Sequence, residues 1–305
     1  MNKVVVIGNF DGVHLGHQAV LRAAREMAGD GSVVALSFWP HPLSIVHPDS
    51  APGLLCDISD RVALLRAAGA DEVSIVEFTP AVAAWSPERF VEKVVWELRP
   101  TTVIVGENFR FGARAAADAD DMRRLADGRF EVTVLPLLCD TEPVSSSRIR
   151  QAVAEGDMAA ARHMLGRWFR YSDIVMLGDQ RGRGLGFPTA NLAVPDTSAC
   201  PADAVYAGYL NHDGTRWPAA ISVGTNPTFD GVVRHVEAYA ITETDLRLYG
   251  ERIGVDFVAR LRGQLRFESR QALIDQMKAD VERALVVLEM NDARGEDLGN
   301  PALAW

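Results

Sequence analysis

Apolar and polar residues alternate along the first half of the chain in a way that predicts a parallel sheet covered by helices. Short apolar runs typical of buried strands occur at residues 4–7, 32–38, 73–78, 103–105 and 132–137. Helical patterns or capping signals between and after them predict helices from near residue 16 to 27 and over 61–68, 87–98, 145–150 and 157–165. Strands that alternate with helices place the helices on both faces of the sheet. Residues 1 to about 165 therefore predict an α/β nucleotide-binding architecture.

The pattern changes near residue 168, where short strand-like runs separated by turn signals begin and continue to about residue 266. This pattern is typical of a small all-β barrel or sandwich. Asp213-Gly214, between apolar runs at 206–210 and 217–221, predicts a hairpin. Apolar positions from 272 to 285 then predict a C-terminal helix packed on the barrel. We expect a first domain at 1–158, a linker at 159–167, a second domain at 168–290 and a tail at 291–305.

Composition and charge limit the classes of function. The 305 residues are 48% hydrophobic and 24% charged, with a net charge of −10, which indicates a soluble globular protein and argues against nucleic acid or an anionic membrane as partner. Cys56, Cys139 and Cys200 are far apart, so no disulfide framework is expected. We find no signal peptide or membrane-spanning run. We therefore expect a cytoplasmic protein; homo-oligomerisation is left open.

A motif at the end of the first predicted strand carries most of the chemical information. Gly8, Gly12 and Gly16 allow a tight strand-to-helix turn, and the N-terminus of the following helix favours an anion such as phosphate. His14 and His17, one helical turn apart, would lie on either side of that anion. A zinc site and two packed core histidines are the alternatives, although zinc needs a third protein ligand.

Two further segments place polar groups where a nucleotide is expected. The loop after strand 103–105 carries Asn108 and Arg110, and it should face the same crevice as the two histidines. A purely structural loop is the alternative. The helix predicted from residue 145 begins with serines and carries Arg148 and Arg150 in its first turn. Cations are unfavourable at a helix N-terminus, so these arginines hint at a polyphosphate.

The second motif lies in the barrel half. Gly182, Gly184 and Gly186 occupy alternate positions ahead of Pro188, and Thr189 and Asn191 follow on an extended segment. The two side chains point the same way and offer oxygen atoms for Mg²⁺ and its phosphates. The segment matches neither a dinucleotide fingerprint nor a P-loop, because the required glycine spacing and following helix are absent.

Together these motifs resemble one known family. His14-Leu15-Gly16-His17 resembles the H-x-G-H signature of nucleotidyltransferases, and its pairing with Gly182 to Leu192 resembles the bacterial bifunctional riboflavin kinase/FAD synthetases. The resemblance extends to about residue 290. Segments 8–17, 40–42, 106–112 and 145–150 match the adenylyltransferase motifs, and segments 182–192, 224–229 and 248–250 with Glu237 match the kinase motifs.

The resemblance implies two reactions on two folds. A C-terminal antiparallel β-barrel would phosphorylate riboflavin to FMN with ATP, and an N-terminal Rossmann-like domain would adenylylate FMN to FAD and release pyrophosphate. In the adenylyltransferase half, the resemblance implies that His14 and His17 stabilise charge on the α-phosphate. In the kinase half, it implies that Thr189 and Asn191 hold Mg²⁺-ATP and that Glu237 takes the proton from the ribityl 5′-hydroxyl. The implied adenylyltransferase contacts are Gly8, Asn9, Phe10, Asp11, Gly16, His41, Asn108, Arg110, Ser146, Arg148 and Arg150; the kinase contacts are Gly182, Gly184, Gly186, Pro188, Thr189 and Asn191.

Two other interpretations remain at this point. The loop at 113–118 is rich in alanine, so the adenylyltransferase half could be degenerate and the protein a riboflavin kinase alone. The other is that the protein is not an enzyme but a regulator that binds a flavin or a nucleotide without turnover. A pure binder would not need both the imidazole pair and a carboxylate base, which favours an enzyme.

Overall fold

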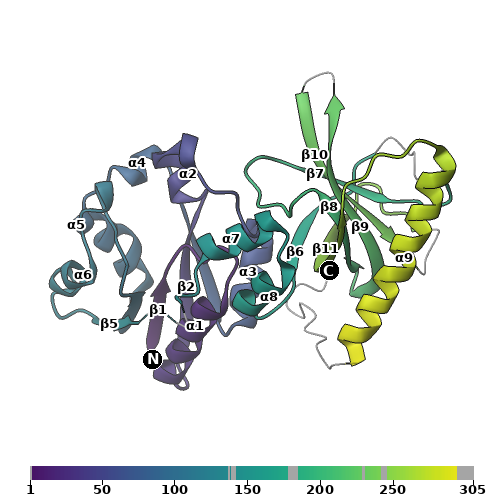
Figure 1. The fold of residues 1–305 in the computed structure, drawn as a ribbon. Coiled ribbons are helices and arrows are strands. Elements are labelled where there is room, and N and C mark those ends of the chain that lie inside the picture. Colours follow the sequence, from purple (N-terminus) through teal and green to yellow (C-terminus); the bar gives the residue numbers. More distant parts are fainter. Residues whose placement is uncertain are drawn as a thin grey trace. The chain divides into compact units, whose positions relative to one another are not determined.

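The computed structural model describes residues 2–136, 138, 142–177, 185–228, 231–241 and 246–293. The chain forms two compact units, one of residues 1–52 and 58–145 and the other of residues 53–57 and 146–305. Figure 1 shows the strands and helices of each unit. In the described part of the chain, no helix has the length and apolar character needed to cross a membrane.

The first unit is built on a parallel sheet of five strands in the order β3-β2-β1-β4-β5. The strands are β1 (Lys3–Ile7), β2 (Ser32–Trp39), β3 (Glu72–Glu77), β4 (Thr102–Gly106) and β5 (Glu131–Leu135). All five fall on the predicted apolar runs, which confirms that part of the prediction. Parallel strands buried on both faces are expected to be continuously apolar, and Val4, Val5, Val6 and Ile7 of the central strand are all buried.

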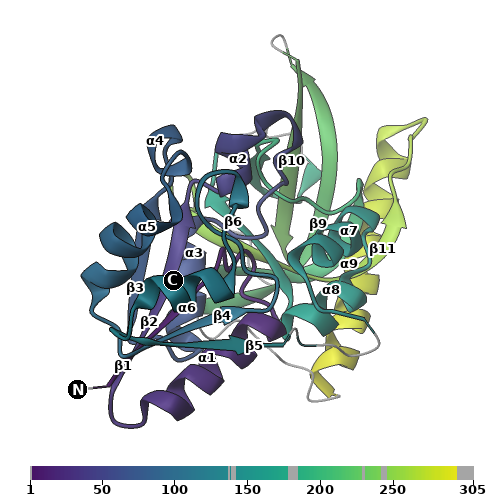
Figure 2. The same cartoon turned by 90° about the vertical axis from the view of Figure 1, so that its left-hand side faces the viewer.

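Helices cover both faces of this sheet, as Figure 2 allows the reader to follow. The helical elements are α1 (Leu15–Ala28), α2 (Pro42–Val46), η1 (Pro48–Ser50), α3 (Ile58–Ala67), α4 (Pro80–Ala83), α5 (Pro87–Phe90), η2 (Val91–Val95), η3 (Trp96–Leu98), η4 (Ala113–Ala115) and α6 (Ala119–Ala126). On one face Val5 and Ile7 pack in a core with apolar residues of α5, η2 and α6. Helix α1 packs on β1 and β2 and buries Leu21 and Ala24. The α/β prediction is therefore confirmed.

The second unit is an antiparallel sheet of six strands in the order β6-β11-β8-β9-β10-β7. The strands are β6 (Phe169–Ile174), β7 (Ala190–Val194), β8 (Ala204–His212), β9 (Thr215–Thr228), β10 (Gly231–Ala240) and β11 (Arg252–Gly263). The sheet curls until its two end strands approach, where the Tyr171 hydroxyl donates to the Ala193 carbonyl at 2.6 Å and the Met176 amide to the Asn191 carbonyl at 2.9 Å. The predicted hairpin is confirmed, because Asp213 and Gly214 both have positive φ and join β8 to β9.

Three helices complete the second unit: α7 (Ser146–Glu155), α8 (Met158–Leu165) and α9 (Arg270–Ala293). Helix α9 lies along the strands, and its Ala284 and Leu288 pack against Trp168, Val205 and Tyr209. It runs eight residues past the predicted end, so its last turn includes residues that the sequence suggested as tail. Residues 294–305 lie outside the described part of the chain.

The division between the units differs from the expected one. Residues 146–158 were assigned to the first domain and 159–167 to a linker, yet α7 and α8 belong to the second unit. The reason is the apolar face of α8: Met158, Ala161 and Leu165 are buried, and the helix packs on β6 and β11. Periodicity along one helix does not reveal which neighbour covers its apolar face.

Candidate functional sites

The predicted residues of the first unit gather at one edge of its sheet. His14 and His17 follow β1, His41 follows β2, and Asn108 and Arg110 follow β4. Because β2 and β4 flank β1 in a parallel sheet, the loops after these strands lie at the same carboxyl edge. The order of the strands reverses at this point, which is where open α/β sheets bind ligands.

The corner between β1 and α1 is packed tightly around two glycines. A Cβ at Gly8 would lie 3.1 Å from the ring of Phe10, and one at Gly16 would lie 3.1 Å from the imidazole of His14. Phe10 itself has φ of +52°, a conformation that L-residues rarely adopt. Gly8 and Gly16 therefore make room for the side chains that shape the corner.

The two histidines form a stacked pair at the start of α1. His14 is the N-cap residue, and its Nδ1 accepts a hydrogen bond from the backbone N–H of His17 at 3.4 Å. The imidazole centroids lie 3.6 Å apart with an angle of 18° between the rings, and the Phe10 ring meets His17 edge-on at 5.2 Å. The pair lies where the helix dipole is positive, so the corner is suited to stabilise an anion.

Three neighbours of the corner have structural partners. The Asn9 carbonyl accepts a hydrogen bond from the Ser37 hydroxyl at 3.0 Å. His41 caps α2 through its Nδ1, which accepts from the Leu43 N–H at 3.2 Å. Asp11 is only 1% exposed and lies 3.5 Å from the buried Arg61. The nucleotide contact that the sequence suggested for Asp11 stays a prediction, and in the structure its carboxylate lies against Arg61.

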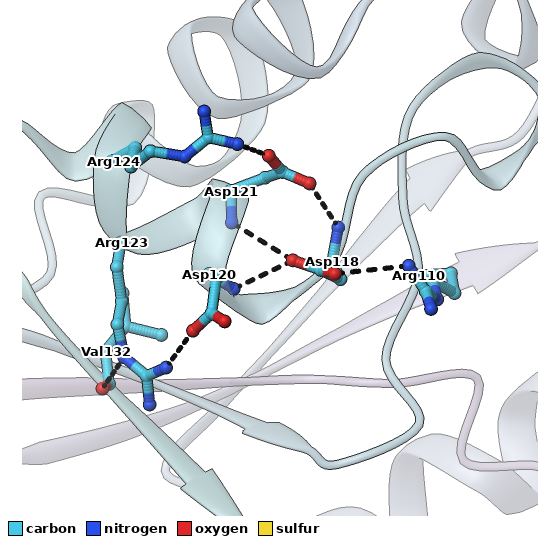
Figure 3. A network of polar contacts seen from close by, with 7 residues as sticks. All are labelled: Arg110, Asp118, Asp120, Asp121, Arg123, Arg124 and Val132. Atoms are coloured by element: carbon cyan, nitrogen blue, oxygen red, sulfur yellow. Dashed lines mark hydrogen bonds and ion pairs between the residues drawn. The ribbon is translucent and has the colours of Figure 1, made fainter.

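The loop after β4 is anchored at the start of α6. Arg110 forms an ion pair with Asp118 at 3.3 Å, and the Asp118 carboxylate accepts hydrogen bonds from the backbone N–H groups of Asp120 and Asp121 (Figure 3). The Asp121 side chain in turn accepts from the Asp118 N–H, which completes a capping box. The guanidinium of Arg110 is thus engaged by a helix cap, although the side chain is 57% exposed. Its phosphate role remains a prediction.

Ser146, Arg148 and Arg150 lie on α7 of the second unit. The Nε of Arg150 donates a hydrogen bond to the Gly53 carbonyl at 2.8 Å, and Gly53 belongs to the same unit. A backbone carbonyl therefore accepts a hydrogen bond from one of the two guanidiniums near the start of the helix. The phosphate role of these three residues stays a prediction.

The predicted kinase residues lie along one row across the second sheet. Directly opposite residues of neighbouring strands follow each other in the order Asn191, Glu237, Ser222, Val205 and Arg262. Opposite residues of antiparallel strands present their side chains on the same face. The sheet register therefore brings Glu237 between Asn191 and Ser222, residues that are separated from it by 46 and 15 positions in the sequence.

Two cavities meet at Glu237. One, of about 240 Å³, lies between the sheet and α9 and is lined largely by apolar side chains, including Phe187, Tyr239 and Met277. The other, of about 370 Å³, is polar, and its walls include Thr225 and His235. Glu237, Ser222 and Gln264 line both cavities. The carboxylate thus lies where an apolar and a polar ligand could meet.

Thr189 and Asn191 lie together at the start of β7. The Asn191 amide nitrogen donates to the Thr189 carbonyl at 3.1 Å and to its hydroxyl oxygen at 3.3 Å. Thr189 lines the apolar cavity. Of the neighbouring predicted residues, Pro188 is partly buried and Gly186 has φ of +89°, whereas Gly182 and Gly184 lie outside the described residues. In the described chain, no three His, Cys, Asp or Glu side chains gather as a metal site.

An ion pair that the sequence did not indicate joins α9 to this site. Both oxygens of Asp280 accept hydrogen bonds from Arg262, at 2.9 and 2.6 Å, and Gln276 donates to the same carboxylate at 2.9 Å. Arg262 and Asp280 both line the apolar cavity. Arg61 of the first unit was missed in the same way, because a single arginine in a helix normally indicates a solvated face.

Cys200 is not a candidate nucleophile. The thiol is buried, and burial raises its pKa to about 11 although the nearby Arg234 acts in the opposite direction. Only the thiolate is a good nucleophile, so the raised pKa disfavours a nucleophilic role for this cysteine at neutral pH. Cys56 is also buried, and among the described residues it forms no disulfide.

Two family models match successive parts of the chain. A model described as FAD synthetase matches residues 1–148, and one described as riboflavin kinase matches residues 165–288. Proteins named bifunctional riboflavin kinase/FMN adenylyltransferase from Listeria monocytogenes and Escherichia coli K12 are each 34% identical over 286 residues, which is 92% of this chain and 90% of theirs. The protein of that name from Bacillus subtilis is 28% identical over 289 residues, covering 93% of this chain and 92% of its own.

A solved structure shares the fold over most of the length. A Streptococcus pneumoniae crystal structure, named as a macrolide-efflux protein, is 31% identical with a TM-score of 0.81. The match covers 92% of this chain and 93% of that one. The arrangement of a Rossmann-like unit followed by a barrel is therefore shared with an experimental structure.

Proposed function

The chain belongs to the bifunctional riboflavin kinase/FMN adenylyltransferase family, and from this we propose which of its residues carry out each reaction. It is an enzyme with both domains, whose substrates are riboflavin, FMN and ATP. The matches to both models support the two-activity interpretation. Nothing in the comparisons favours a kinase alone or a binding protein without turnover.

In the first unit, the His14 and His17 imidazoles stabilise the negative charge that develops on the α-phosphate of ATP while pyrophosphate leaves. The stacked geometry supports this role, because rigid donors already directed at a developing charge need no reorganisation during the reaction. The helix dipole at the same point acts in the same direction. The FMN phosphate is the nucleophile, so this site needs no separate base.

In the second unit, Glu237 is the general base for phosphorylation. Its carboxylate orients the ribityl 5′-hydroxyl and takes its proton as the oxygen attacks the γ-phosphate of ATP, with ADP leaving. The observation that carries this proposal is that Glu237 lies in the walls of both cavities and directly opposite Asn191 in the sheet. The two substrates then approach the carboxylate from different sides.

Thr189 and Asn191 are the residues that would hold Mg²⁺. Their adjacent hydroxyl and amide groups fit this ion, which prefers oxygen ligands and usually keeps substrate phosphates in its coordination shell. When bound, Mg²⁺ neutralises charge on the transferred phosphoryl group. The two protein oxygens alone are too few to fill its shell, so we expect binding together with ATP.

The chemistry of the two cavities supports an assignment of the substrates. The flat flavin ring suits the cavity under α9, where Phe187, Tyr239 and Met277 supply apolar surface. ATP suits the polar cavity with Thr225 and His235, and its phosphates would reach past Glu237 to Thr189 in the wall of the apolar cavity. Met277→Ala should therefore raise KM for riboflavin and leave KM for ATP unchanged, while Thr225→Ala should do the reverse. If Met277→Ala raised only KM for ATP, the assignment would be wrong.

The proposal is tested by incubating the protein with riboflavin, ATP and Mg²⁺ and separating the flavins by chromatography. Accumulation of FAD supports two working sites, and a stop at FMN would leave only the kinase. Unchanged riboflavin would contradict both.

We further propose that the enzyme acts in the cytoplasm and has no nucleic-acid partner. The net charge of −10 supports the absence of a nucleic-acid partner.

A further inference from the structure

Arg61 is a fully buried arginine beside the histidine corner of the first unit. It lies on α3 with 0% of its surface exposed. Its Nη1 donates to the Phe38 carbonyl at 3.2 Å, and its guanidinium lies over the Trp39 ring, 5.5 Å from the centroid. Its Nη2 lies 3.5 Å from the Asp11 carboxylate. One side chain therefore contacts both the loop after β1 and the end of β2.

This arrangement is not optimised for stability. Nε and Nη2 of Arg61 donate no hydrogen bond to any residue in the described part of the chain. A buried charge whose donors are incompletely satisfied is costly, and such a pair can often be replaced by apolar side chains without loss of stability. Local conflicts of this kind are expected where a structure serves function.

The two segments that Arg61 joins both carry site histidines. Asp11 lies between Phe10 and Val13, two non-glycine residues with positive φ, in the loop that leads directly to His14. Backbone in this conformation persists only where its surroundings hold it. Phe38 and Trp39 lead to His41. A shift of Arg61 would thus release the loop after β1 from the end of β2.

We propose that Arg61 is a positioning residue for adenylyl transfer. Through Asp11 it fixes the loop that places His14 and His17, and through Phe38 it ties that loop to the end of β2. This inference rests on the proposed role of the two imidazoles. Positions in a reacting site matter steeply, since a displacement of about 1 Å can cost about a hundredfold in rate.

The test compares Arg61→Lys, Asp11→Asn and the double variant in the full-length enzyme supplied with FMN, ATP and Mg²⁺. Lysine keeps the charge but cannot contact Asp11, the Phe38 carbonyl and the Trp39 ring together. We expect kcat for FAD formation to fall at least about tenfold in each single variant, with KM for ATP within about twofold. The double variant should be no slower than the slower single variant, because both changes break the same connection.

Arg66→Met is the matched control, since Arg66 is on the same helix and exposed. It should leave FAD formation unchanged, and riboflavin phosphorylation should be unchanged in every variant. Thermal unfolding followed by near-UV circular dichroism reports whether the first unit remains folded. If Arg61→Lys unfolds that unit, the inference is tested by kcat for FAD formation in Asp11→Asn, a change that keeps the side-chain volume.

Three results would overturn the inference. The first is a kcat within twofold of wild type in the folded single variants, and the second is a pair of losses that multiply in the double variant. The third is unfolding of the first unit by both single changes, which would mean that the pair serves stability alone. A failure of the proposed imidazole role is distinguishable, because His17→Ala would then form FAD at the wild-type rate whatever the Arg61 and Asp11 variants do.

Discussion

The two sites of this enzyme are assembled in different ways. In the first unit the proposed catalytic pair comes from one continuous turn, where His14 caps the helix that carries His17. In the second unit Asn191, Glu237 and Ser222 come from three strands and meet only through the sheet register. A site within one turn is specified by local sequence, whereas a site across strands depends on the whole sheet. The four predictions below use this difference.

The largest effect is expected at the site across strands. Glu237→Gln keeps the size of the side chain but removes the base, so FMN formation should fall by about 10²- to 10⁴-fold. Conversion of added FMN to FAD should continue at the wild-type rate, because the first unit does not use this residue. Flavin chromatography with riboflavin or FMN as substrate measures both steps. Equal losses in both would contradict the separation of the sites.

The corresponding change in the turn is His17→Ala. Removal of one donor from a site that stabilises developing charge costs about 10²- to 10³-fold, so the reaction should stop at FMN. Riboflavin phosphorylation in the same sample is the internal control. A His17→Ala enzyme that still made FAD at the wild-type rate would show that the stacked imidazoles have only a packing role.

A smaller effect is expected where α9 meets the sheet. Asp280→Asn weakens the paired hydrogen bonds from Arg262 that hold α9 over the apolar cavity. A loss of about 1–2 kcal/mol would raise KM for riboflavin about 5- to 30-fold. Asp275→Asn is the matched control, because Asp275 lies on the same helix and is bonded only to an exposed glutamine among the contacts described. Equal effects of the two changes would disprove a specific role of Asp280.

The smallest effect should come from the helix cap that anchors the loop after β4 in the first unit. Asp118→Ala removes the N-cap of α6, shown in Figure 3, and should destabilise the first unit by about 1 kcal/mol. Arg110 also loses its partner, so FAD formation should change little or improve. Urea unfolding of the full chain, monitored with a probe of the first unit, measures the difference in free energy of unfolding between wild type and Asp118→Ala. A loss of FAD formation of tenfold or more would mean that the cap has a direct part in the site.

The sequence predicted most of the fold, and local sequence alone singled out the residues of one of the two candidate sites. The apolar run at 4–7 and the hairpin at Asp213-Gly214 both depend on neighbours in sequence, and the structure has them. The histidine corner was predicted for the same reason. Glu237, by contrast, is an ordinary strand residue until the register places it opposite Asn191, so only the family resemblance singled it out.

The features that the sequence missed depend on contacts between distant segments. Arg61 and Asp11 are 50 positions apart, and Arg262 and Asp280 come from a strand and a helix. The assignment of α7 and α8 to the second unit depends on which surface covers the apolar face of α8. Periodicity and propensity describe a segment, and they contain no information on its distant partners.

The most direct test of the central claim mixes the two site variants. Glu237→Gln should make no FMN from riboflavin, and His17→Ala should make FMN but no FAD. We propose that the sites act independently and that FMN is released between them. A mixture of the two variants supplied with riboflavin, ATP and Mg²⁺ should then accumulate FAD. A mixture that stops at FMN, while Glu237→Gln alone converts added FMN to FAD, would contradict the account.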